Sequence, residues 1–319
     1  MLILFHDTLW GAPLDLPGPV EGIEFSTDRT LFSAADAVVF HLPEWRFKRT
    51  PTAGAGETLP EKRPRQLWVA WSMECEQHYP FMSDPNFMAA FDLTMTYRRT
   101  ADVTLNYANP HGDIAAMHES FRRPPSHYKK KDALVASFIS SRFDQSGRSG
   151  YLQDLAQYLA IDSYGRFMRN RVLDPDLGRM SKLKTIADYK FTIAFENACA
   201  EDYVTEKFFD PLWAGSVPVY LGAPNIEEFA PGDRCYIDAS LYPDPQSLAK
   251  YLLELASDDQ AYNAFFKWKT KPFRKTFEDL LTDYTTHWSQ RLSKCVKEHL
   301  ISRIKYDSPI EIDATGFSE

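Results

Sequence analysis

The sequence predicts an α/β protein with two domains, each built around a parallel β-sheet. Short apolar runs alternate with amphipathic stretches, a pattern typical of βαβ units with right-handed crossovers. The runs at 38–40 and 67–70 are almost continuously apolar, as expected of strands buried on both faces of a parallel sheet. A chain of 319 residues with 44% hydrophobic residues is long enough for two ordinary domains.

The first domain is expected over residues 1–125. Its strands are predicted at 2–5, 37–42, 67–71 and 93–97. Residues 51–65 are rich in proline, glycine, threonine and charge, which indicates a surface loop. Residues 122–132 combine paired prolines with a basic run, and we interpret them as a linker between the domains.

The second domain is expected over residues 132–285. Its strands are predicted at 134–139, 161–163, 191–195 and 217–221, with helices at 151–159, 180–188 and 246–256. Residues 286–319 are expected to form a terminal helix followed by a loosely ordered tail. The helix is predicted because apolar side chains between Trp288 and Ile304 fall near one helical face. The tail is predicted because no hydrophobic period continues beyond Tyr306.

Composition excludes several classes of protein. The net charge of −8 disfavours nucleic acid as a partner, because binding phosphates needs clustered cations. No apolar run approaches the ~18 residues of a membrane span, and the first residues lack the features of a signal peptide. The four cysteines are widely separated and no glycosylation sequon occurs, so we expect a cytoplasmic protein. The eight histidines form no zinc-binding pair, and no metal site is predicted.

Residues 189–222 are the most informative part of the chain. Two apolar strands, 191–195 and 217–221, bracket a polar turn and a helix, and polar side chains gather where the first strand ends: Glu196, Asn197, Tyr203, Glu206 and Lys207. Ligands bind at this end of a parallel sheet. The helix is expected to begin near Val204 or Thr205, and its N-terminal N–H groups would stabilise an anion.

Two side chains of this helix suit a phosphorylated sugar. A lysine in the first turn, Lys207, opposes the helix dipole by about 0.3 to 1 kcal/mol, so it is better explained by phosphate binding than by stability. Glu206 can accept hydrogen bonds from sugar hydroxyls. The alternative is a capped helix with a solvated Glu–Lys pair.

A second basic turn follows the predicted strand 134–139. The chain has neither of the usual glycine-rich phosphate loops, and the nearest glycine-bearing turn is 146–150. Arg148 in this turn can point to the same crevice as Lys207, and arginine suits bidentate phosphate binding. Arg142 could serve likewise, although an exposed arginine in a loop is more often merely solvated.

Three blocks of residues carry a family resemblance: Phe195-Glu196-Asn197, Asp202-Tyr203-Val204-Thr205-Glu206-Lys207 and Ala214-Gly215-Ser216-Val217-Pro218-Val219-Tyr220-Leu221-Gly222. In this order they resemble the signature of the α-1,3/4-fucosyltransferases, glycosyltransferase family 10. A looser likeness, including Trp71-Ser72-Met73-Glu74, extends over roughly residues 65–270. The sequence shows neither the membrane anchor and sequons of animal members nor the heptad repeats that end some bacterial members. The resemblance therefore points to a soluble enzyme of the bacterial type or to an engineered catalytic domain.

The resemblance implies a GT-B fold, in which two Rossmann-like domains face one another across a cleft. It also implies an inverting transfer of L-fucose from the donor GDP-fucose, with no obligatory cofactor and a divalent cation at most stimulatory. By position, Arg148 and Lys207 would hold the diphosphate, Tyr203 would contact the donor, and Glu206 would bind ribose or fucose hydroxyls. Glu196 and Asn197 would brace the turn.

The resemblance further implies that Glu74 is the general base. It follows a buried strand and a tryptophan, where partial burial can raise its pKa toward the working pH. Glu76 is the competing candidate, and the alternative for Glu74 is a plain surface carboxylate. The pair Asp174 and Asp176 resembles an Asp-x-Asp cation site, but we interpret it as a turn because it does not end a buried strand.

The implied acceptor is O3 or O4 of an N-acetylglucosamine or glucose unit in a β-galactoside-containing glycan. Two alternatives stay open: a GT-B enzyme that uses another nucleotide sugar, and a glycan-binding pseudo-transferase.

The C-terminal part of the chain is basic. Residues 267–305 carry ten Lys or Arg against four Asp or Glu, which gives a net charge of +6 in this segment and −14 in the rest of the chain. The basic terminal helix could therefore contact an anionic membrane peripherally, or its apolar face could pack across the domains.

Overall fold

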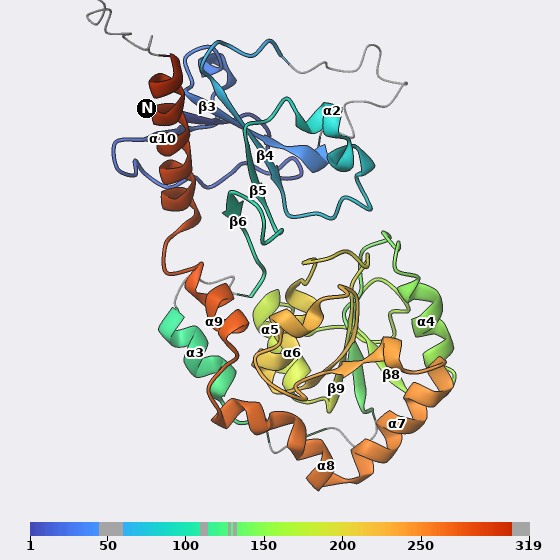
Figure 1. Cartoon of the computed structure of the whole chain (residues 1–319). Helices are drawn as coiled ribbons and strands as arrows, with labels where there is room; N and C mark the ends of the chain where they lie inside the picture. Colours follow the sequence, from blue (N-terminus) through green and yellow to red (C-terminus); the bar gives the residue numbers. More distant parts are fainter. Residues whose placement is uncertain (45–59, 109–113, 127–128, 130–132, 308–319) are drawn as a thin grey trace, which may run out of the picture.

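The computed structural model describes residues 1–44, 60–108, 114–126, 129 and 133–307. Two sheets dominate it, one from each half of the chain (Figure 1). The first sheet has the strand order β2-β1-β3-β4-β5-β6 and the second β11-β10-β9-β7-β8. Every pair of neighbouring strands is parallel, as predicted.

The first sheet contains the four predicted strands and two short ones at its edges. Its members are β1 (Leu2–Phe5), β2 (Glu24–Ser26), β3 (Ala37–His41), β4 (Leu67–Ser72), β5 (Leu93–Thr96) and β6 (Val103–Thr104). All five residues of β3 are buried, which explains its continuous apolar run. The short elements η1 (Arg29–Leu31), η2 (Pro80–Ser83) and α2 (Pro85–Met88) lie in the connections, and Phe81 and Phe87 cover one face of the sheet.

The second sheet is covered by helices on both faces. Its strands are β7 (Val135–Ser137), β8 (Ile161–Ser163), β9 (Phe191–Phe195), β10 (Val217–Leu221) and β11 (Ile237–Asp238). One face packs against α4 (Arg148–Leu155), α7 (Pro245–Ser257), α8 (Asp259–Asn263) and η5 (Ala264–Thr270). The other packs against α6 (Glu206–Ala214), with α5 (Arg179–Ala187), α3 (Ile114–Arg122) and α9 (Lys275–Thr282) next to it. Two further turns are η3 (Ile226–Phe229) and η4 (Ala239–Leu241).

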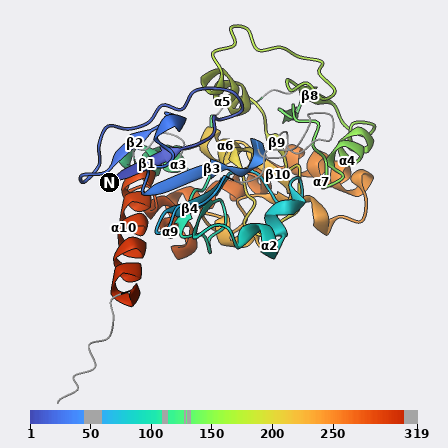
Figure 2. The ribbon, with the colours of Figure 1, turned by 90° about the horizontal axis from the view of Figure 1, so that it is seen from above.

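The last helix, α10 (Trp288–Asp307), returns to the first sheet. Leu292 and Val296 are fully buried in the core formed by β1, β3, β4 and β5, and Figures 1 and 2 show the helix beside these strands and away from α4 and α7. The apolar face of α10 is thus packed against the first sheet, whereas the second alternative above expected it to pack across the domains. No helix among the described residues is long and apolar enough to cross a membrane.

Some sequence predictions fall outside the described residues: most of the loop at 51–65, part of the linker at 122–132, and the tail beyond Asp307. The predicted helix at 151–159 in fact begins at Arg148 and ends at Leu155. The other two predicted helices of the second half agree with α5 and α7 to within one residue at each end.

The strand order of the second sheet has a consequence for ligand binding. From β7 the chain first adds β8 on one side and then β9 on the other, so the order reverses between β7 and β9. Such a switch point leaves a crevice at the carboxyl ends of its two strands, where open α/β sheets bind ligands. Arg148 follows β7 and Glu196 follows β9, so the chain brings both to this point.

Candidate active site

The turn between β9 and α6 is held by a buried carboxylate. Glu196 is 0% exposed; its Oε1 accepts from N of Thr205 at 2.7 Å and its Oε2 from Oγ1 of Thr205 at 2.8 Å. Thr205 is the N-cap of α6, and the helix begins at Glu206, one residue beyond the predicted start near Val204 or Thr205. Burial raises the pKa of Glu196, and the charge of Lys207 opposes that rise. Glu196 therefore fixes where the helix begins.

Gly222, at the end of β10, leaves space for that carboxylate. A Cβ atom at this position would lie 2.6 Å from Cγ of Glu196 and 2.5 Å from the hydroxyl oxygen of Tyr220. Both neighbours are buried, so neither can move away at low cost. A glycine is required here by the close approach of the Glu196 side chain, rather than by backbone conformation.

Lys207 lies between two carboxylates. Its Nζ is 3.3 Å from Oε1 of Glu206 and 3.6 Å from Oε2 of Glu196, and it donates to Oγ1 of Thr205 at 3.0 Å. Burial lowers the pKa of Lys207, but the charges of Glu206 and Glu196 outweigh burial and raise it. Burial likewise raises the pKa of Glu206, but Lys207 and Lys182 outweigh it and lower that pKa to about 2. Lys207 is charged and 21% exposed, and Glu206 is ionised and 40% exposed.

Arg148 lies at the start of α4 and is completely buried. Its Nη1 donates to the carbonyl of Phe195 at 3.1 Å, and its Nη2 donates to the carbonyls of Ser141 and Phe143, each at 3.1 Å. Burial lowers the pKa of the guanidinium, and the charges of Glu196 and Asp144 oppose this. The side chain ties the loop after β7 to the end of β9.

This placement gives Arg148 a different immediate role from the one expected. The sequence suggested an arginine that points freely into the crevice, whereas the structure covers it with residues 141–143. A direct contact between Arg148 and a phosphate stays a prediction. Arg142, in the same loop, is exposed.

Asn197 offers an unused acceptor beside the turn. It is 6% exposed, and its Oδ1 has no hydrogen-bond partner within the described part of the chain. Its carbonyl accepts from N of Gln145 at 2.7 Å, which also joins the loops after β7 and β9. Asn197 thus braces the two loops through its backbone, while a buried amide oxygen without a partner is costly unless a ligand or water donates to it.

Glu74 approaches this segment from the first sheet. It follows β4, and its backbone N donates to Oγ of Ser72 at 3.0 Å. Its Oε2 accepts from the hydroxyl of Tyr203 at 3.2 Å, although the two residues are 129 positions apart. Glu74 is half-buried, and burial raises its pKa. The hydrogen bond from Tyr203 and the charges of His78 and Lys207 act in the opposite direction but do not cancel this rise. This is the environment that the sequence predicted for a general base.

Glu76 has other partners. It pairs with Nη2 of Arg98 and accepts from the hydroxyl of Tyr97. A carboxylate whose oxygens are already held by an arginine and a tyrosine is not free to contact an acceptor hydroxyl. Between the two candidates, the geometry favours Glu74.

Two supporting residues were not singled out from the sequence. Tyr107 donates its hydroxyl to the carbonyl of Met73 at 2.5 Å and so fixes the residue next to Glu74. Asp202 adopts a positive φ of 63°, accepts from N of Arg99 at 3.0 Å, and accepts from Nδ2 of Asn225 at 2.9 Å. An aspartate before Tyr203 could have signalled this turn, since Asp and Asn tolerate left-handed backbone. Nothing in the sequence marks Tyr107.

The Asp-x-Asp pair forms a turn at the surface. Asp174 and Asp176 are exposed in a bend between β8 and α5, where Oδ1 of Asp176 accepts from N of Gly178 at 2.9 Å. Within the described residues, no three His, Cys, Asp or Glu side chains gather closely enough to hold a metal ion.

Comparisons with known proteins match both halves of the chain. The sequence model described as "Glycosyltransferase family 10 (fucosyltransferase) C-term" matches residues 128–306, and the one described as "Fucosyltransferase, N-terminal" matches residues 2–108. A "Putative fucosyltransferase-like protein" of Arabidopsis thaliana is 37% identical over 251 residues, 76% of this chain and 45% of that protein. The "GDP-fucose protein O-fucosyltransferase 3" of Bos taurus is 33% identical over 221 residues, 65% of this chain and 46% of that protein.

The fold also matches a solved structure. The crystal structure titled "Crystal Structure of alpha1,3-Fucosyltransferase" superposes with a TM-score of 0.55 at 14% identity, covering 88% of this chain and 81% of the other. With the two parallel sheets, this match confirms the predicted GT-B type of α/β fold. The chain spans about half the length of the two curated relatives named above.

Proposed function

The chain belongs to glycosyltransferase family 10, the fucosyltransferases, and from this premise we propose that it transfers L-fucose from GDP-fucose to a hydroxyl group of an acceptor. The family match includes the turn between β9 and α6, with Glu206 and Lys207 at the first turn of the helix. This arrangement supports binding of a nucleotide sugar, since the ammonium and the helix N-terminus favour a diphosphate and the carboxylate can accept from sugar hydroxyls.

The contact between Glu74 and Tyr203 carries the proposal best. It places a carboxylate of the first sheet next to the proposed donor segment of the second, with Lys207 and Glu206 near enough to act on the pKa of Glu74. A displacement at a sugar carbon needs a base on the acceptor side and cations on the leaving-group side. In this protein both groups come together from opposite halves of the chain.

We propose an inverting reaction in one step. Glu74 takes the proton of the acceptor hydroxyl, whose oxygen forms a bond to the anomeric carbon of fucose. The bond from that carbon to the β-phosphate oxygen breaks, and its electron pair leaves with GDP. Lys207 and the charge of Arg148 offset the negative charge that develops on the diphosphate. Tyr203 donates to one carboxylate oxygen of Glu74 and leaves the other for the acceptor.

The remaining expected contacts are proposals of the same kind. Glu206, exposed by 40%, is available to ribose or fucose hydroxyls. Tyr203 is 2% exposed, so a direct contact with the donor would involve only the edge of its ring or its hydroxyl. The free acceptor atom of Asn197 would receive a hydrogen bond from the bound donor or from a water beside it.

For the acceptor we propose O3, or O4, of an N-acetylglucosamine or glucose unit in a β-galactoside-containing glycan. The bovine relative is named as a protein O-fucosyltransferase, so an acceptor hydroxyl on a folded protein is the second candidate. Incubation with GDP-fucose on a glycan array, with linkage analysis of the product, tests the first. Transfer to a protein substrate with no transfer to any glycan would favour the second.

Two other functions are tested by the same assay. A GT-B enzyme with a different donor would hydrolyse or transfer another nucleotide sugar and leave GDP-fucose unchanged. A glycan-binding pseudo-transferase would bind GDP or glycan but give no product. The presence of Glu74, Glu206 and Lys207 in one cluster favours a working enzyme over the pseudo-transferase.

We further propose a cytoplasmic enzyme in which the exposed Lys294 on α10 can contact an anionic membrane surface. Lys294 is 74% exposed, whereas the apolar face of the helix is buried, so such a contact would be electrostatic. Cosedimentation with phosphatidylglycerol vesicles at low salt, lost at high salt, is the expected result.

A further inference from the structure

A cavity of about 1100 Å³ lies at the other end of the second sheet from the candidate active site. Leu134 and Lys190, which immediately precede β7 and β9, line it, so it is at the amino ends of these strands. A five-residue strand spans about 16 Å. The cavity is therefore separate from the carboxyl-end crevice that contains Glu196 and Lys207.

The lining is strongly cationic in a chain whose net charge is −8. Among the described residues, one carboxylate contributes to the lining, that of Asp259, which is paired with Lys190 at 3.1 Å and is itself 86% exposed. The cationic side chains that line the cavity in this part of the chain are Arg122, Lys129, Lys190, Lys267 and Lys269.

Two of these lysines are held by backbone carbonyls. Nζ of Lys129 donates to the carbonyls of Ala187 and Gly215, both at 2.7 Å. Nζ of Lys269, which is 3% exposed, donates to the carbonyls of Phe121 and Leu212 at 2.8 and 2.9 Å. In the described part of the chain, neither ammonium forms a salt bridge. Buried charges are normally paired, because desolvation costs more than carbonyl dipoles return.

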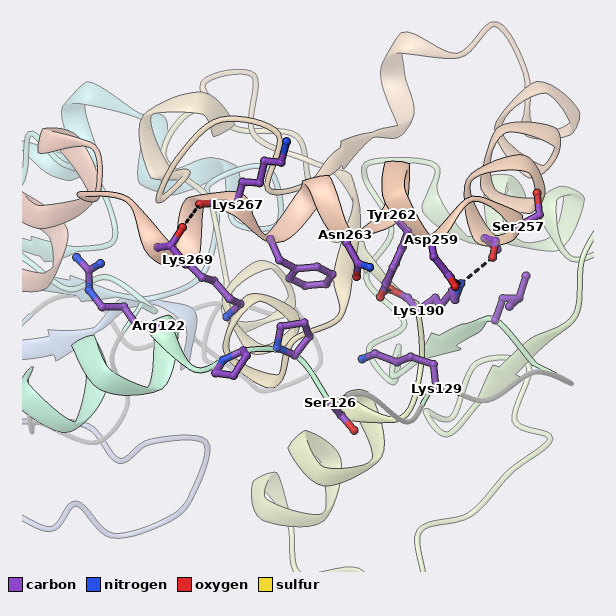
Figure 3. A pocket seen from close by; sticks show the side chains of 16 residues that line it. Arg122, Ser126, Lys129, Lys190, Ser257, Asp259, Tyr262, Asn263, Lys267 and Lys269 are labelled. Carbon is purple, nitrogen blue, oxygen red and sulfur yellow. Dashed lines mark hydrogen bonds and ion pairs between the residues drawn. The ribbon is translucent and has the colours of Figure 1, made fainter.

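We propose that this cavity binds an anion that carries two or more phosphate groups. Figure 3 shows the cations spread along it, with Arg122 at one end, Lys129 and Lys190 toward the other, and Lys269 between them. Cations at both ends and in the middle of the cavity suit a chain of phosphates better than a single small anion. The charges of Lys129 and Lys269 would act mainly through their field, and Arg122 and Lys267, which are exposed, can contact the ligand directly.

Proton uptake gives the site a characteristic signature. Burial lowers the pKa of Lys129 to about 8, with Asp188 opposing and Lys190 adding to the effect. Burial lowers the pKa of Lys269 to about 7, with Cys235 opposing and Lys129 adding to it. A bound polyanion favours the charged form of both lysines and raises both pKa values. Binding at pH 8 is therefore expected to take up protons.

The test is a calorimetric titration of the full chain with tripolyphosphate at pH 8 and constant ionic strength, in the presence of one equivalent of GDP for the donor site. Saturating GDP is avoided because it would also fill a cavity that takes diphosphates. We expect saturable binding of one ligand per chain, with proton uptake revealed by two buffers of different ionisation enthalpy. The double variant Arg122→Glu/Lys267→Glu is expected to bind at least tenfold more weakly. The matched double variant Lys275→Glu/Lys294→Glu makes the same charge change at exposed positions outside the cavity and is expected to bind within twofold of wild type.

Either of two results would overturn the proposal: no saturable binding to the wild type, or equal weakening in both double variants, which would indicate only a general charge effect. Thermal unfolding of each variant checks that it is folded. Titration with GDP alone separates the sources of the phosphates. If the wild type binds GDP at two sites and Arg122→Glu/Lys267→Glu loses one of them, the cavity takes nucleoside diphosphates. If the wild type binds GDP at one site and still binds tripolyphosphate, the ligand of the cavity is an inorganic phosphate chain.

Discussion

The hydroxyl of Tyr203 donates a hydrogen bond to Oε2 of Glu74 at 3.2 Å, across the boundary between the two sheets. Tyr203 belongs to the turn that precedes α6, and Glu74 follows β4. The contact holds the proposed base against the proposed donor segment. Burial raises the pKa of the Glu74 carboxyl, and the hydrogen bond from Tyr203 lowers it. The contact therefore helps to set the pH at which Glu74 can accept a proton.

Tyr203→Phe is predicted to move the acid limb of the pH profile. As a base, Glu74 is active when ionised, so kcat/KM falls as the pH drops through its pKa. The hydrogen bond from Tyr203 stabilises the carboxylate, and its removal raises the pKa of Glu74. The acid limb of kcat/KM should therefore move to higher pH, measured from initial rates of fucose transfer. Tyr107→Phe, which removes a hydrogen bond to the carbonyl of Met73, is the control and should leave the limb in place.

Lys207→Ala is predicted to weaken GDP binding. The ammonium lies at the first turn of α6, and a charge-assisted contact with phosphate is worth roughly 1.5 to 3 kcal/mol, or about 10- to 150-fold in Kd. Isothermal titration with GDP measures it. Lys250→Ala, at a position 77% exposed on α7, should bind GDP as the wild type does. An unchanged affinity in Lys207→Ala would remove this lysine from the donor site.

Thr205→Ala is predicted to destabilise the fold by about 1 to 3 kcal/mol. The change removes the N-cap hydroxyl of α6 and leaves Oε2 of the buried Glu196 without the hydrogen bond from Oγ1. Urea unfolding measures the loss. Thr205→Ser keeps the hydroxyl and should recover most of the stability, whereas equal losses in both variants would show that the methyl group, not the cap, matters.

Much of the fold could be predicted from the sequence, because strands buried on both faces must be apolar throughout. This applies to β3 and β9, which are entirely buried. The edge strands β2, β6 and β11, which have only two or three residues each, were not predicted. The start of α6 was predicted near its position at Glu206.

The candidate site was less accessible from sequence, because its geometry depends on long-range packing. Arg148 is an ordinary loop arginine by pattern, and only the fold of residues 141–143 buries it against three carbonyls. The pairing of Lys207 with Glu196 depends on the turn that Thr205 closes. No local pattern shows that Glu74, rather than Glu76, has an oxygen available for the acceptor.

Metal removal is predicted to leave the activity intact. The proposed mechanism offsets charge on GDP with Lys207 and Arg148, and Asp174 and Asp176 lie in an exposed bend. Fucose transfer should therefore proceed at an unchanged rate in excess EDTA. The contrary result has two parts: the wild type loses its activity in EDTA and regains it with manganese, whereas Asp174→Asn/Asp176→Asn does not respond to manganese. This result would assign a metal role to the pair.

The most direct test of the central claim is the rate of fucose transfer by Glu74→Gln beside that of Glu76→Gln. Glutamine keeps the shape of each side chain but cannot accept the proton. Glu74→Gln is expected to lose about 10²- to 10⁴-fold in kcat, with the affinity for GDP unchanged within twofold, while Glu76→Gln keeps most of its kcat. If Glu74→Gln transfers fucose within a few fold of the wild-type rate, Glu74 is not the base and the proposed mechanism is wrong.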